Sequence, residues 1–164
     1  MREHVLRAEQ TLNAPLDRVF AFFADAGNLE AITPAFLAFH IETTRPIEMK
    51  PGALIDYSLR LHGLRFNWRS RITVWEPGVR FVDEQIKGPY ALWVHEHTFA
   101  PVPGDPTRTR VTDVVRYAHA GWVLEPLVHR VFVRPRLEEI FAFRAEATRR
   151  LIEGKQAGDR GRAA

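Results

Sequence analysis

The chain has 164 residues and 46% of them are hydrophobic, which suits one domain with a sizeable core and excludes a disordered chain. It contains no cysteine, so disulfides, thiolate nucleophiles and cysteine-ligated metals are excluded. The pI is about 9.7, but the net charge is only +3 and the arginines are scattered. A nucleic-acid binder gathers its basic residues on one face, so we expect no nucleic-acid partner.

The sequence shows no targeting or membrane segment. Residues 1–10 are mixed and charged, unlike the apolar stretch of a secretory signal. No apolar run approaches the roughly 18 residues that a membrane span needs. We expect a soluble, cytoplasmic protein without an integral membrane segment, either a monomer or a homodimer formed through an unpaired edge strand.

The first part of the chain predicts one strand and two short helices. Residues 3–12 read as a strand. Pro15 can occupy the first position of a helix, and the apolar residues after it recur at near-helical spacing, which predicts a helix over residues 15–24. Asp25 is a good N-cap and indicates a second helical turn over residues 25–30.

A run of strands follows, separated by glycine and proline pairs that are typical of tight turns. The predicted strands cover residues 37–44, 53–61, 64–76, 79–86, 91–99 and 108–118, with a loop over residues 101–106. Strands that are joined by tight hairpins form an antiparallel sheet.

Two of the turns, at residues 62–63 and 77–78, fix the register of the strands beside them. Apolar pairs then sort onto one face and opposite charges onto the other, and a one-residue slip would scramble this sorting. The predicted facing pairs are Leu61 with Leu64, Leu59 with Phe66, Tyr57 with Trp68, Ile55 with Ser70, Asp56 with Arg69, Ser58 with Asn67, Arg60 with Arg65, Val74 with Phe81, Ile72 with Asp83, Ser70 with Gln85, and Arg71 with Glu84. The pair of Arg60 with Arg65 is the one that does not fit the sorting.

The pattern after Gly121 becomes helical. It predicts a short helix over residues 123–133, a kink or restart at Pro135, and then a long helix that Gly154 ends. The residues sharing one face of this helix are Leu137, Ile140, Phe141, Arg144, Thr148 and Leu151. One apolar face of the sheet must be covered, and only this helix is long enough to cover it.

The element order and three strings carry a resemblance to a known superfamily. The strings are LNAPLDRVFAFFADAGNLEAITP, FVDEQIKGPYALWVHEHTF and IFAFR. They resemble the START-like (SRPBCC) superfamily of polyketide cyclases, coenzyme Q-binding proteins and pollen-allergen-like proteins, and within it a bacterial ligand-binding group of unassigned substrate. The resemblance covers residues 3–153.

The resemblance implies an α+β helix-grip fold, in which a curved antiparallel sheet of about seven strands wraps around the long C-terminal helix. Two short helices follow the first strand. We expect a START-like ligand-binding domain over residues 1–154 and a disordered tail over residues 155–164. The resemblance also implies a cavity between sheet and helix, which we expect to measure roughly 300–1,000 Å³, as ligand sites usually do.

Strand alternation places polar groups among the apolar ones on the inner face, and buried polar groups need partners. They can orient a mainly apolar ligand, or they can hydrogen-bond one another and internal water. The expected ligand-binding residues are Tyr57, Leu59, Phe66, Trp68, Ser70, Ile72, Phe81, Asp83, Gln85, Trp93, His95, His97, Phe99, Asp113, Tyr117, Leu137, Phe141 and Arg144.

His95 and His97 form a His-x-His pair, which puts both imidazoles on one side of a strand, as in many zinc sites. Asp113 would be the third ligand, but no spacing fixes it, so we expect neither a metal nor a cofactor. The same histidines with Asp113 or Asp83 could act as general acid and base. No Gly-x-Ser-x-Gly nucleophile motif and no glycine-rich phosphate loop is present.

These observations favour a protein that binds or carries a hydrophobic molecule, such as a lipid, an isoprenoid or an aromatic polyketide, and that is not an enzyme. The alternative is a cyclase or dehydratase that uses a histidine–carboxylate pair chosen from His95, His97, Asp113 and Asp83. A third hypothesis is an interaction module with a filled core and no ligand.

Overall fold

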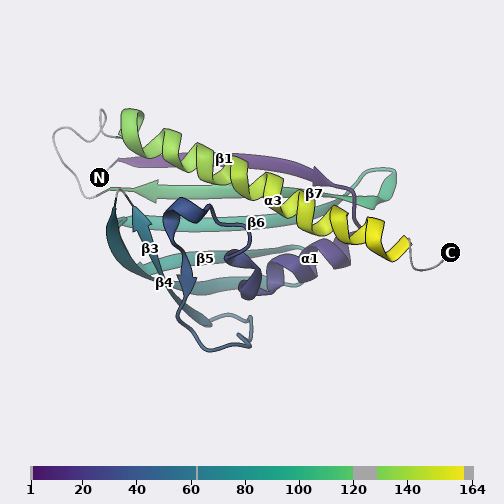
Figure 1. Ribbon diagram of the computed structural model, residues 1–164, viewed down its shortest axis with the longest axis horizontal. Coiled ribbons are helices and arrows are strands. Elements are labelled where there is room, and N and C mark those ends of the chain that lie inside the picture. Colours follow the sequence, from purple (N-terminus) through teal and green to yellow (C-terminus); the bar gives the residue numbers. More distant parts are fainter. Residues whose placement is uncertain (1, 62, 120–128, 161–164) are drawn as a thin grey trace.

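The computed structural model describes residues 2–61, 63–119 and 129–160 (Figure 1). Its elements run as one strand, a helix with two short 3₁₀ turns, six more strands and a long C-terminal helix. They are β1 (Glu3–Leu12), α1 (Leu16–Ala24), η1 (Ala26–Leu29), η2 (Ala35–Leu37), β2 (His40–Ile41), β3 (Leu54–Leu61), β4 (Leu64–Glu76), β5 (Arg80–Lys87), β6 (Leu92–Val102), β7 (Asp105–Ala118), η3 (His129–Val133) and α3 (Arg134–Arg160).

All seven strands form one antiparallel sheet in the order β1-β7-β6-β5-β4-β3-β2. The sheet curves, and α3 runs along its concave side over β1 and β7 (Figure 1). Helix α1 lies near the C-terminal end of α3. This arrangement confirms the expected helix-grip fold. No helix within the described residues is both long and apolar enough to cross a membrane.

The predicted hairpin register is confirmed across residues 62–63 for every pair. It is also confirmed for Ser70, Arg71 and Ile72 across the next hairpin. The expected pairing of Val74 with Phe81 is wrong. A β-bulge between residues 72 and 74 shifts the register, so that Trp75 faces Phe81 instead. A bulge adds one residue to one strand only, and alternation read from two turns does not reveal it.

Three expected boundaries change. The predicted strand over residues 37–44 shrinks to His40–Ile41, because η2 and the left-handed Ala38 (φ 42°) precede it. The predicted loop at residues 101–106 is wrong, since β6 continues to Val102 and β7 begins at Asp105. The turn between them is tight because Gly104 adopts φ 78°, a conformation that glycine takes without strain.

At the C-terminal end, residues 123–128 of the predicted short helix lie outside the described residues. Its last part, His129–Val133, is a π-helical turn that leads into α3. Pro135 lies in the first turn of α3, where a missing N–H disturbs no helical bond. The helix is described to Arg160, so Gly154 lies inside it and does not end it. The domain boundary at residue 154 stays a prediction.

One end of the barrel-like sheet has a filled aromatic core. Phe20 of α1 packs against Phe99 with ring centroids 5.2 Å apart and against Trp75 at 5.4 Å. Phe81 and Val111 complete this cluster from β5 and β7. Because side chains pack closely at this end, a cavity between the sheet and the helix must lie nearer the middle of the sheet.

Candidate functional site

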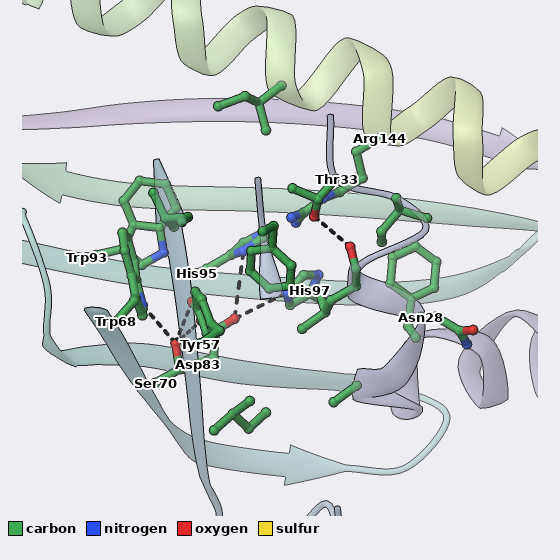
Figure 2. A pocket seen from close by; sticks show the side chains of 18 of the residues that line it. Asn28, Thr33, Tyr57, Trp68, Ser70, Asp83, Trp93, His95, His97 and Arg144 are labelled. Carbon is green, nitrogen blue, oxygen red and sulfur yellow. Dashed lines mark hydrogen bonds and ion pairs between the residues drawn. The ribbon is translucent and has the colours of Figure 1, made fainter. Parts of the chain in front are cut away.

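A cavity of about 150 Å³ lies between the sheet, α3, and the turns η1 and η2. Strands β3 to β6 supply one wall, with alternate side chains pointing inward. Leu137, Ile140 and Phe141 of α3 supply the opposite wall. The cavity is smaller than the expected range of roughly 300–1,000 Å³ for ligand sites. Large aromatic side chains, Trp68 and Trp93 among them, line it (Figure 2).

Most of the predicted ligand-binding residues meet around this cavity. Those that line it are Tyr57, Leu59, Trp68, Ser70, Ile72, Phe81, Asp83, Trp93, His95, His97, Leu137, Phe141 and Arg144. Those that do not line it are Phe66, Gln85, Phe99, Asp113 and Tyr117. No ligand is present, so a binding role for any of them stays a prediction.

The residues outside the cavity wall have other partners. Phe99 belongs to the aromatic core. The hydroxyl of Tyr117 lies 2.8 Å from Nε2 of His129. The amide of Gln85 donates to the backbone carbonyl of Tyr90 at 2.7 Å. A Cβ at residue 88 would collide with the Gln85 side chain, which would have to move to admit any other residue there. Phe66 is half-buried on the β3–β4 hairpin, and nothing in the structure explains why it misses the cavity.

Several cavity-lining residues were missed by the sequence interpretation. Phe22 and Phe23 reach the cavity from the end of α1, and Asn28 and Leu29 reach it from η1. Tyr90 lies in the β5–β6 connection and packs against Trp93 with the rings tilted and their centroids 4.8 Å apart. The helical spacing of apolar residues predicted that one face of α1 would be buried. It did not show that Phe22 and Phe23 would face a cavity and not the packed core.

A chain of hydrogen bonds crosses the strand wall of the cavity (Figure 2). Trp68 donates its indole N–H to Oγ of Ser70 at 3.1 Å, and the hydroxyl of Tyr57 lies 3.1 Å from the same oxygen. Ser70 in turn donates to Oδ1 of Asp83 at 3.3 Å. The chain therefore ties three strands, β3, β4 and β5, to one carboxylate.

The carboxylates of Asp83 and Asp113 both contact the imidazoles of His95 and His97, from opposite sides. Oδ2 of Asp83 lies 3.4 Å from Nε2 of His97 and 3.7 Å from Nδ1 of His95. Oδ1 of Asp113 lies 3.0 Å from Nε2 of His95 in a hydrogen bond. It also lies 2.8 Å from Nδ1 of His97, but without the alignment of a hydrogen bond. Each imidazole is thus held between two carboxylates.

Burial and charge act in opposite directions in this cluster. Burial alone would raise the pKa of Asp83, but the hydrogen bond with His97 and the nearby positive charges lower it. Burial likewise opposes ionisation of Asp113, but its contacts with His95 and His97 hold the pKa of its carboxyl far below the usual range. Both carboxylates are therefore ionised at neutral pH.

The two histidines differ although they are neighbours. Burial, together with the charge on His97, lowers the pKa of His95. Burial also acts to lower the pKa of His97, but the contacts with Asp113 and Asp83 outweigh it and raise that pKa. Burial raises the pKa of the Tyr57 and Tyr90 hydroxyls, so both remain neutral hydrogen-bonding groups.

Arg144 brings a positive charge from α3 to the cavity. Its guanidinium carbon lies 5.3 Å from the ring centroid of Phe141, and its charge helps to lower the pKa of Asp83. Its Nε is buried and has no hydrogen-bond partner within the part of the chain that the structure describes. A buried donor without a partner is unfavourable, so this N–H can donate a hydrogen bond to an oxygen atom of a ligand at little structural cost.

Asp83, and not the expected Asp113, lies with His95 and His97 in an arrangement that could hold a metal ion. Asp83, His95 and His97 can each offer a donor atom, and the three donor atoms lie within 4.8 Å of one another. All three residues line the cavity, whereas Asp113 does not. Asp113 occupies the far side of both imidazoles, because β7 lies beyond β6 as seen from β5.

Comparison with known proteins agrees with this fold. The family described as polyketide cyclase/dehydrase and lipid transport matches residues 12–144. Among curated proteins, none matches the sequence at a significant level.

Several solved structures share this fold. A protein of Thermus thermophilus, TTHA0849, is 17% identical with a TM-score of 0.68, over 93% of this chain and 99% of that one. The Zhui aromatase/cyclase of Streptomyces is 18% identical with a TM-score of 0.65, over 92% and 96%. A norcoclaurine synthase mutant of Thalictrum is 14% identical with a TM-score of 0.68, over 94% and 97%. At these identities the likeness extends to the fold alone.

Proposed function

Because the chain belongs to the polyketide cyclase/dehydrase and lipid transport family, we propose that its cavity binds a compact hydrophobic molecule with a polar or anionic end. The observation that carries the proposal is the cavity itself. It has apolar walls on both sides and a small set of convergent polar groups, which is the usual composition of a small-molecule site.

The size of the cavity narrows the class of ligand. An engineered apolar cavity of about 150 Å³ is large enough to hold benzene, and the cavity here measures about 150 Å³. A one- or two-ring aromatic system fits such a volume with modest side-chain movement. A long-chain lipid or an extended isoprenoid would have to leave most of its length outside. The cavity therefore favours a small aromatic compound over the lipid and the isoprenoid expected from the sequence, and one smaller than the expected aromatic polyketide.

The polar groups of the site suggest how the ligand would be oriented. Arg144 offers a buried N–H without a partner on the helix side, while Ser70, Asp83 and the histidines gather on the sheet side. Trp68 and Trp93 lie in a T-shaped pair with centroids 5.3 Å apart and offer ring surfaces to an aromatic guest. We propose that the rings contact the tryptophans and the anionic end faces Arg144.

Isothermal titration calorimetry with 2-naphthoate in the presence of EDTA tests the proposal. The wild-type protein should bind one molecule, and Leu59→Trp should lose binding because the larger side chain enters the cavity. Leu64→Trp is the matched control, since Leu64 lies on the other strand of the same hairpin and is 66% exposed. Equal affinities for the two variants and the wild type would place the ligand elsewhere and contradict the proposal.

A second candidate function is favoured by the pairing of His95 with Asp113. A histidine whose ring is oriented by a buried carboxylate, next to a second histidine in a cavity, is the arrangement that general acid–base catalysis needs. A cyclase or dehydratase could use it on a bound polyketide. In that case His95→Ala and His97→Ala should each abolish turnover of an aromatic polyketide precursor and leave its affinity nearly unchanged. If these variants lose affinity for the precursor to the same extent as turnover, the histidines act in binding and not in catalysis.

A further inference from the structure

We propose that Asp83, His95 and His97 form a binding site for a divalent transition-metal ion, with Asp113 as the carboxylate that orients both imidazoles. This inference does not depend on the proposed ligand, because metal binding can be measured without any organic molecule. It replaces the expectation of a metal-free protein.

The donor separations fit an ion held at ordinary bond lengths. Zinc bonds to imidazole nitrogen and carboxylate oxygen measure about 2.0–2.2 Å, so tetrahedral ligands lie roughly 3.3–3.6 Å apart. Oδ2 of Asp83 lies 3.4 Å from Nε2 of His97 and 3.7 Å from Nδ1 of His95. All three donor atoms lie within 4.8 Å of one another, and Figure 2 shows Asp83 joined to both histidines. Two of the three separations are therefore close to those around a bound ion, and the two imidazole nitrogens would have to take up the same spacing.

The outer side of the site has the support that metal-bound histidines usually have. A ligating imidazole typically donates its other N–H to a carboxylate, which fixes its tautomer and orientation. Nε2 of His95 has this support in its hydrogen bond to Asp113 at 3.0 Å. Nδ1 of His97 lies 2.8 Å from the same oxygen without hydrogen-bond alignment, so the His97 ring would have to turn to donate to it. The nitrogens that remain, Nδ1 of His95 and Nε2 of His97, are those that face Asp83.

The proposed position of the ion lies between two groups that repel one another. If His95 donates Nε2–H to Asp113, its Nδ1 carries a lone pair that faces the carboxylate oxygen of Asp83 at 3.7 Å. Two acceptors that face one another in a buried site are unfavourable unless a positive charge lies between them. A divalent cation would supply that charge between His95 and Asp83.

The donor set indicates the class of ion. Two imidazoles and one carboxylate suit zinc, iron(II), cobalt(II) or nickel(II) better than magnesium or calcium, which prefer oxygen ligands alone. Three protein ligands leave an open coordination position, as in catalytic sites. Since the three residues line the cavity and Asp113 does not, that position faces the cavity. An oxygen of a bound guest could occupy it.

Cobalt(II) titration of EDTA-treated protein, purified without a histidine tag, is the direct test. We expect one cobalt ion per chain, visible d–d absorption of a four- or five-coordinate site, and displacement by one equivalent of zinc. The absence of saturable cobalt binding to the wild-type protein would overturn the proposal, without recourse to any variant.

Substitutions then separate ligands from the supporting residue. Asp83→Asn should weaken cobalt binding by more than about 100-fold because it removes a charged ligand, whereas Asp113→Asn should weaken it about 10–100-fold and keep the same spectrum. His40→Ala is the control, since its ring lies 3.2 Å from Glu30 at the surface and away from the cavity. Unchanged affinity in Asp83→Asn, or equal loss in His40→Ala, would contradict the site.

Discussion

Trp68 donates its indole N–H to the hydroxyl oxygen of Ser70 inside the cavity wall, across 3.1 Å. This bond joins residues two positions apart on the same face of β4, and both side chains are buried. Ser70 completes its hydrogen bonding with Tyr57 and Asp83. A single small hydroxyl group thus links the aromatic wall of the cavity to its acidic cluster.

Ser70→Ala should destabilise the protein by about 1–3 kcal/mol, because the buried N–H of Trp68 loses its acceptor. Urea denaturation followed by circular dichroism measures this change. Asn67→Ala is the control: Asn67 is exposed on the same strand, and its substitution should change stability by no more than about 0.5 kcal/mol. Equal effects of the two substitutions would mean that the bond contributes nothing.

Arg144→Met should weaken the binding of 2-naphthoate by about 10–100-fold, which corresponds to the loss of one hydrogen bond to a charged group. It should leave the affinity for uncharged naphthalene within a factor of about three, because methionine keeps the apolar stem. Calorimetry in EDTA measures both affinities. Arg149→Met serves as the control, since Arg149 is exposed on the same helix. A similar loss for both compounds would show that Arg144 acts through packing.

Phe99→Ala should lower the free energy of unfolding by about 3–5 kcal/mol and leave ligand affinity unchanged. Its ring is 3% exposed and belongs to the aromatic core rather than to the cavity wall. Denaturant unfolding measures the first effect and calorimetry the second. Phe143→Ala, on the exposed side of α3, should change neither. If Phe99→Ala folds but binds the ligand more weakly, Phe99 contributes to the ligand site, and this prediction is wrong.

Saturation with 2-naphthoate should stabilise the folded protein by about 2.7 kcal/mol when the free ligand is present at 100 times its dissociation constant. Thermal unfolding at several ligand concentrations measures this increase. The Leu59→Trp variant, in which the cavity is filled, should show no increase over the same concentrations. A rise of the same size in that variant would mean that the ligand stabilises the protein from another surface.

The sequence was sufficient for the register around residues 62–63 because a two-residue turn admits one pairing and the apolar pairs then share a face. It was not sufficient for Trp75, since the bulge before it is a local departure that alternation does not record. The same limit applied to residues 37–44. There, β-compatible composition did not reveal that Ala38 would take a left-handed conformation.

Strand alternation correctly placed Ser70, Asp83, His95 and His97 on one inner face. It did not show which imidazole nitrogen faces which carboxylate, because that depends on rotamers and on the offset between β5, β6 and β7. The role of Asp113 changed for this reason: it lies behind the histidines and not beside Asp83.

Nuclear magnetic resonance of the tryptophan indole N–H groups during titration with 2-naphthoate tests the central claim most directly. Trp68 and Trp93 line the cavity, while Trp75 packs against the aromatic core. We expect the resonances of Trp68 and Trp93 to shift with a common saturable affinity while that of Trp75 remains in place. Saturable binding that leaves Trp68 and Trp93 unmoved, or no binding at all, would contradict a ligand cavity between the sheet and α3.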